Sequence, residues 1–134
     1  MLDRVLMASP VTHVTGYLFG LEMPFLTGSP ALLMERWQAS EAVELIEREG
    51  LTVMFGATPF LPELLDEPEA RGMRLPSLRL FPCGGASVPP DLIRRAARVT
   101  QRCKAFRIFG ATEVPMVTKG FVGGAGGDLA EETD

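Results

Sequence analysis

Residues 107–115, "RIFGATEVP", place a glycine, a hydroxyl group and a carboxylate directly after a short apolar run. A threonine hydroxyl such as that of Thr112 suits a phosphate oxygen, and a carboxylate such as that of Glu113 suits Mg²⁺. An ordinary turn at the protein surface accounts for the same residues equally well. The segment by itself therefore leaves a phosphate and metal site and a plain turn both open.

Three further polar loops follow apolar runs elsewhere in the chain. They contain the only histidine, His13, the threonine Thr58 and the glycine pair at residues 84–85. The histidine could simply start a helix, and the glycine pair could simply form a tight turn. In proteins with a parallel sheet, ligands bind just beyond the carboxyl ends of the strands, and these ends lie along the same edge of the sheet. If the apolar runs are such strands, the four loops are neighbours, and their convergence carries more weight than any one of them.

Short apolar runs alternate with helical patterns along the whole chain. The pattern predicts strands over residues 4–9, 30–34, 51–57, 78–85 and 105–110. It predicts helices over residues 13–28, 40–50, 59–68 and 89–102. We expect the first helix to be buried and broken near Pro24, and the second to be capped by Ser40 and ended by Gly50. This order is typical of an α/β fold with an open, mainly parallel sheet of about five strands and helices on both faces.

The composition restricts the class of protein. The chain has 134 residues, enough for one domain, and its net charge of −4 argues against a general nucleic-acid binder. Cys83 and Cys103 have neither the number nor the spacing of a disulfide framework or a zinc site. No apolar run approaches the length of a membrane span, and the N-terminus lacks the layout of a signal peptide, so we expect a cytoplasmic protein. Residues 119–134 are rich in glycine and acids and are predicted to be a flexible tail or truncated loop after a partial α/β subdomain over 1–118.

Taken in order, four segments resemble the landmarks of the adenylate-forming superfamily, the AMP-binding enzymes that include acyl-CoA synthetases, peptide-synthetase adenylation domains and luciferases. The segments are "PVTHVTG", "AVELIEREGLTVMFGATPFLPELL", "SLRLFPCGGASVPPDLIRRA" and "FGATEVP". The resemblance runs from about residue 3 to residue 118 and covers part of the large N-terminal domain of that family.

The resemblance implies an ATP-dependent ligase. In this family a carboxylic acid attacks the α-phosphate of ATP, which gives an acyl-adenylate and pyrophosphate, and a thiol, usually that of coenzyme A, then takes the acyl group. The implied ligands are ATP or AMP, Mg²⁺, coenzyme A and a small carboxylic acid. By resemblance, Thr112, Glu113 and His13 are the catalytic residues, and Glu113 holds the metal. Gly84, Gly85, Ala86, Phe109, Gly110, Ala111 and Thr112 border the nucleotide, and His13, Gly16, Thr58 and Gly84 belong to the substrate pocket.

Two features depart from the family pattern. Phe109 stands where the family usually has tyrosine, so ring stacking is kept and a hydroxyl is lost. The family's S-G-T-T-G-x-P-K-G phosphate loop and its C-terminal catalytic lysine have no counterpart here. We therefore expect an internal fragment that does not complete adenylation alone, and that self-associates through exposed apolar surface. A non-catalytic binding or oligomerisation module and a generic flavodoxin-like ligand binder remain the alternatives.

Overall fold

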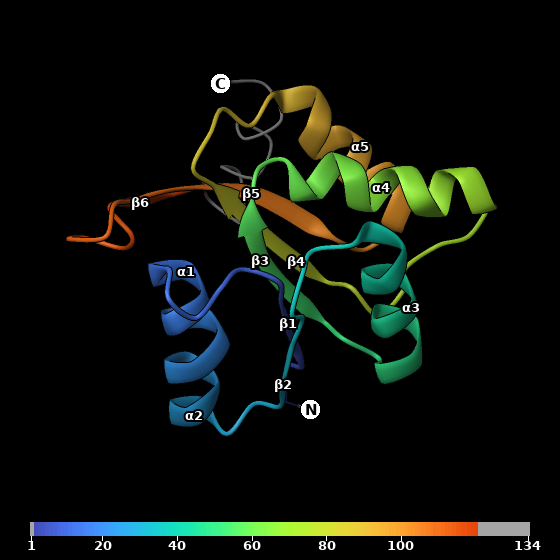
Figure 1. Ribbon diagram of the computed structural model, residues 1–134. Helices are drawn as coiled ribbons and strands as arrows, with labels where there is room; N and C mark the ends of the chain where they lie inside the picture. The colour runs from blue at the N-terminus through green and yellow to red at the C-terminus, as the bar shows by residue number, and fades with distance from the viewer. Residues whose placement is uncertain (1, 121–134) are drawn as a thin grey trace.

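A computed structural model describes residues 2–120, which form one sheet with helices packed against it (Figure 1). The strands are β1 (Val5–Met7), β2 (Ala31–Leu33), β3 (Val53–Ala57), β4 (Leu80–Gly84), β5 (Lys104–Phe109) and β6 (Thr118–Lys119). The helices are α1 (Val14–Tyr17), the π-helix η1 (Leu18–Glu22), α2 (Met23–Thr27), α3 (Ala39–Glu49), α4 (Phe60–Arg71) and α5 (Pro90–Thr100). None of these described helices has the length and hydrophobicity needed to cross a bilayer. Most of the predicted tail, residues 121–134, lies outside the described residues.

The strands lie in the order β2-β1-β3-β4-β5-β6, and the first five are mutually parallel. The predicted α/β fold with a mainly parallel sheet is therefore confirmed. The sixth strand, β6, pairs antiparallel with β5 and was not predicted. It has two residues, both exposed, so it carries no buried pattern that a sequence could reveal.

Helices cover both faces of the sheet, as predicted (Figure 1). One face carries α3, α4 and α5, and the larger core lies between them and side chains such as Leu6, Met54 and Phe81. The other face carries α1, η1 and α2, with a smaller core that includes Val5 and Phe55. Leu6 and Val5 enter different cores because successive side chains of a strand point to opposite faces.

The first helical segment differs from its prediction in two respects. Its irregular part is the π-helix η1, which ends before Pro24, whereas a break near that proline was expected. Helix α2 continues directly from η1, and the backbone N–H of Met23, the residue before Pro24, donates to the Leu18 carbonyl, so the π-type turn ends directly before the proline that lacks an N–H. The segment is also not a buried helix: Phe25 is 88% exposed and Leu26 is 75% exposed. Apolar composition predicted burial, but no other described element covers this side of the helix.

Two helix ends also differ from the sequence expectation. Helix α3 begins at Ala39 with Gln38 at its N-cap, so Ser40 lies inside the first turn and does not cap it. Helix α4 continues beyond Pro68 to Arg71, one turn further than predicted. The buried ring of Pro68 and an ion pair of 2.8 Å between Arg71 and Glu67 accompany this extension.

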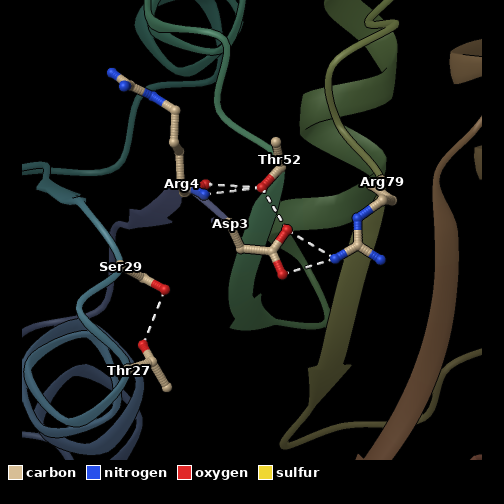
Figure 2. Close-up of polar contacts among 6 residues, drawn as sticks. All are labelled: Asp3, Arg4, Thr27, Ser29, Thr52 and Arg79. Atoms are coloured by element: carbon tan, nitrogen blue, oxygen red, sulfur yellow. Dashed lines mark hydrogen bonds and ion pairs between the residues drawn. The ribbon is translucent and has the colours of Figure 1, made fainter. Parts of the chain in front are cut away.

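A polar network joins the amino ends of three strands, at the sheet edge opposite the predicted site (Figure 2). The carboxylate of Asp3 accepts hydrogen bonds from Nη2 of Arg79 and from the hydroxyl of Thr52. The backbone N–H of Arg4 donates to the same hydroxyl oxygen at 2.9 Å. The hydrogen bond from Arg79 holds the pKa of Asp3 below its usual value. The network fixes where β1, β3 and β4 begin relative to one another.

Candidate functional site

A hollow of about 280 Å³ lies at the carboxyl ends of the parallel strands. Its lining includes His13 from the loop after β1, Gly56 near the end of β3, Gly84 and Gly85 at the end of β4, and Thr112 after β5. The loops that the sequence pattern placed on one edge thus meet around one space. We call this space the first hollow.

A second hollow, of about 440 Å³, adjoins the first. Gly85, Ile108 and Gly110 line both spaces, and Ala86 and Phe109 line the second alone. Phe109 is 67% exposed, so its ring offers a surface on which a flat ligand could stack. The two hollows are therefore neighbours that share three lining residues.

His13 is held at the start of α1 by its own loop. The ring Nδ1 of His13 accepts a hydrogen bond of 3.2 Å from the backbone N–H of Thr15. The backbone N–H of His13 donates to the Pro10 carbonyl at 2.9 Å. Gly16 is buried beneath this loop and does not line the first hollow. A Cβ at Gly16 would stand 2.1 Å from the Pro10 carbonyl oxygen, so only glycine allows the loop to lie this close to the helix.

The glycine pair allows the end of β4 to pack closely against the backbone of β5. A Cβ at Gly84 would stand 2.2 Å from the carbonyl oxygen of Ile108. Gly85 has a φ of +84°, in the left-handed region that side chains disfavour. The pair therefore presents bare backbone to both hollows.

Thr58 is buried behind the glycine pair, with 7% of its surface exposed. Its backbone N–H donates to the Gly84 carbonyl at 3.0 Å, and its hydroxyl lies 3.2 Å from that oxygen and 3.1 Å from the Ala86 carbonyl oxygen. Thr58 is not among the residues that line the first hollow. Its connection to the site is thus through the backbone of the glycine loop.

The turn after β5 places Thr112 and Glu113 differently. Ala111 and Val114 exchange backbone hydrogen bonds of 2.9 and 3.1 Å, which closes the turn around these two residues. Thr112 lines the first hollow, whereas Glu113 is exposed and lines neither hollow. Among residues 2–120, no three His, Cys, Asp or Glu side chains gather as a metal site.

Sequence reasoning missed Arg107. Its Nε donates a hydrogen bond of 2.8 Å to the Val88 carbonyl, and its side chain lines the second hollow. The charged residue inside an otherwise apolar strand was the available signal.

Burial raises the pKa of the neighbouring Cys83 thiol to about 12, with Arg107 opposing part of the shift, so Cys83 stays protonated and has a packing role.

Comparison with known proteins gives one consistent result. A family model described as AMP-binding enzyme matches residues 1–133. The medium-chain fatty-acid–CoA ligase of Escherichia coli is 34% identical over 111 residues, which are 83% of this chain and 19% of the relative. Feruloyl-CoA synthase of an Amycolatopsis species is 31% identical over 112 residues, 83% of this chain and 22% of the relative. The chain thus spans about a fifth of the length of the curated relatives it matches.

A solved structure agrees with these relatives. The O-succinylbenzoate coenzyme A synthetase of Bacillus subtilis, in complex with ATP and magnesium ion, superposes with a TM-score of 0.75. The two are 28% identical, and the match covers 87% of this chain and 24% of the solved one.

Proposed function

The chain belongs to the family of AMP-binding enzymes, and from this premise we propose that it is part of an ATP-dependent carboxylic acid–CoA ligase. In the proposed reaction a carboxylate oxygen of the acid forms a bond to the α-phosphorus of ATP, and pyrophosphate leaves. The sulfur of coenzyme A then bonds to the acyl carbon of the acyl-adenylate, and AMP leaves. The protein contributes by positioning the reactants and stabilising charge.

One observation carries the proposal: His13, Gly84 and Thr112, from three distant loops, line a single hollow at the carboxyl edge of the sheet. Bare glycine backbone lets a flat ligand lie close, and the exposed ring of Phe109 offers a stacking surface in the adjoining hollow. The described residues therefore fit a nucleotide that extends from the second hollow into the first.

Within this proposal each site residue has a role. The nucleotide is bordered by Gly84, Gly85, Ala86, Phe109, Gly110, Ala111 and Thr112. The Thr112 hydroxyl donates to an α-phosphate oxygen, and His13 lies beside the carboxylate of the acid. Glu113, in the turn beside Thr112, would hold Mg²⁺, which would neutralise charge on the phosphate oxygens. Gly16 and Thr58 support the substrate pocket from behind its surface.

The proposed acid has an uncharged acyl group. Small or apolar residues such as Val14, Ala57 and Ile108 share the lining of the first hollow with hydroxyl residues such as Thr15 and Thr112, and no Asp, Glu, Lys or Arg is among the residues that line it. A lining without carboxylate, ammonium or guanidinium groups suits an acyl group that carries no charge. The names of the two curated relatives, a medium-chain fatty-acid ligase and a feruloyl-CoA synthase, agree with an aliphatic or aromatic acid.

The 134-residue chain alone is not expected to complete adenylation, because the family's phosphate loop and catalytic lysine are absent from its sequence. Exposed apolar side chains such as Phe25, Leu26 and Val117 support self-association of the isolated chain. A cytoplasmic location stays a prediction from sequence.

The test is acid-dependent exchange of labelled pyrophosphate into ATP. The complete enzyme that contains this chain should catalyse the exchange with at least one acid from a panel of aliphatic and aromatic acids, and the isolated chain should not. ATP binding by the complete enzyme without exchange for any acid would favour the non-catalytic module. Exchange by the isolated chain would contradict the fragment interpretation.

A further inference from the structure

The glycine loop, residues 84–86, carries little in its own sequence to fix its shape. Gly85 lacks a side chain and sits at a φ of +84°, so the peptide units on either side of it rotate at low energetic cost. This loop also borders both hollows, since Gly85 lines the two of them and Ala86 lines the second. Its shape therefore has to be fixed by contacts from another part of the chain.

Thr58 provides such contacts on both sides of Gly85. Its backbone N–H donates to the Gly84 carbonyl at 3.0 Å, which satisfies that oxygen. Its hydroxyl has a single hydrogen and is then available to the Ala86 carbonyl, 3.1 Å away. One residue thus holds the carbonyl oxygens before and after the flexible glycine.

The direction of these carbonyl groups matters for an anionic ligand. A carbonyl oxygen carries partial negative charge, and both oxygens are directed toward Thr58, which is buried and does not line the first hollow. Without the hydroxyl, rotation at Gly85 and Ala86 could turn the Ala86 carbonyl toward the second hollow, where its oxygen would take up space that the base needs and would oppose the acceptor nitrogens of the ring.

We propose that Thr58 is a positioning residue that holds the glycine loop in the shape required for nucleotide binding. This inference rests on the proposed function, since it takes the ligand of the two hollows to be an adenine nucleotide. It assigns Thr58 a role through the backbone of Gly84 and Ala86, distinct from direct contact with the acid.

The chain contains a matched control. Thr52 precedes β3 by one residue, as Thr58 follows it by one, and its hydroxyl is similarly engaged, with Asp3 and the backbone N–H of Arg4 (Figure 2). Both threonines can be replaced by valine, which keeps the shape and removes the hydroxyl. Thr52→Val disturbs the edge of the sheet that is remote from the hollows, so it reports the effect of losing such a hydroxyl on stability alone.

The experiment compares Thr58→Val, Thr58→Ser and Thr52→Val in the complete enzyme. Two readouts are used: AMP affinity by calorimetry without acid, and KM for ATP and kcat in pyrophosphate exchange at saturating acid. Thr58→Val should weaken AMP binding about tenfold and raise KM for ATP about tenfold, because a tenfold change in affinity corresponds to about one lost hydrogen bond. The value of kcat should stay within about twofold of wild type. Thr58→Ser should restore both values, and Thr52→Val should lower the melting temperature without changing either.

Wild-type AMP affinity in Thr58→Val would overturn the proposal, as would an equal loss of affinity in Thr52→Val. If Thr58→Val does not fold, Thr58→Ala removes the same hydroxyl without adding a methyl group and decides the same question. If the wild-type enzyme binds AMP but shows no pyrophosphate exchange, the proposed ligase activity is refuted. The comparison of AMP affinities between wild type and the threonine variants would still decide the role of Thr58. Absence of AMP binding by the wild-type enzyme would refute both.

Discussion

The carboxylate of Asp3 accepts two hydrogen bonds of 2.7 Å from Nη2 of Arg79 and so joins the amino ends of β1 and β4 across β3 (Figure 2). The pair lies at the sheet edge away from the two hollows. Asp3→Asn should therefore change stability and leave nucleotide affinity unaltered. Because both side chains are more than a third exposed, the loss in unfolding free energy at neutral pH should stay below about 1 kcal/mol.

The same pair predicts a pH dependence. Arg79 lowers the pKa of Asp3, so the stabilisation is fully present above the usual carboxyl value of about 4 and is lost as pH falls through the lower folded-state value. Urea unfolding of the wild type and Asp3→Asn from neutral pH down to about pH 3 should show the difference between them shrinking in the acid range. A difference in unfolding free energy that stays constant over this pH range would show that the ionised carboxylate of Asp3 does not stabilise the fold.

Gly84→Ala should damage both stability and binding. The new Cβ would stand 2.2 Å from the Ile108 carbonyl oxygen, so β4 and β5 would have to separate, at a cost of about 2 kcal/mol or more. Gly28→Ala is the control, because a Cβ at Gly28 would face open space. The φ of +70° at Gly28 should by itself lower the unfolding free energy of that variant by about 1 kcal/mol. Urea unfolding and AMP calorimetry on both variants check this, and equal AMP affinities would count against a site at Gly84.

Glu113→Gln should weaken metal-dependent turnover without unfolding the protein. Glu113 is exposed in the turn beside Thr112, so the amide is accommodated while the negative charge that attracts Mg²⁺ is lost. The Mg²⁺ concentration for half-maximal pyrophosphate exchange should rise roughly tenfold, with an unchanged melting temperature. Normal turnover at limiting Mg²⁺ would exclude Glu113 as the metal ligand.

Both thiols should be unreactive in the folded protein. Burial raises the pKa of Cys83 and of Cys103 to about 12, so neither forms appreciable thiolate near neutral pH. Iodoacetamide should leave both unmodified under native conditions and alkylate both in urea, as measured by mass spectrometry. Native labelling of Cys83 would indicate that the strand end beside the glycine pair opens.

Local patterns were sufficient to predict most of the fold. The apolar stripe of α3 and its terminal Gly50 placed that helix nearly correctly, because both signals lie within a few residues of the structure they determine. Strand β6 was not predictable because it consists of two exposed residues with no buried pattern. The uncovered side of α2 was not predictable because its exposure depends on which elements pack beside it.

The candidate site shows the same limit. His13, Gly84 and Thr112 were selected because each lies at or after the end of an expected strand, and the parallel topology brings them to the lining of one hollow. Arg107 and the backbone contacts of Thr58 were missed, because the sequence shows a charge within a strand and a hydroxyl after one but does not show which groups they contact.

The residues shared by the two hollows bear on the design of ligands. Since Gly85, Ile108 and Gly110 line both spaces, two fragments that each occupy one hollow need only a short covalent connection between them. Binding of the first fragment would present the second at a high effective concentration, so the joined molecule could bind far more tightly than either fragment. Fragment pairs joined beside these shared residues are therefore suitable starting compounds.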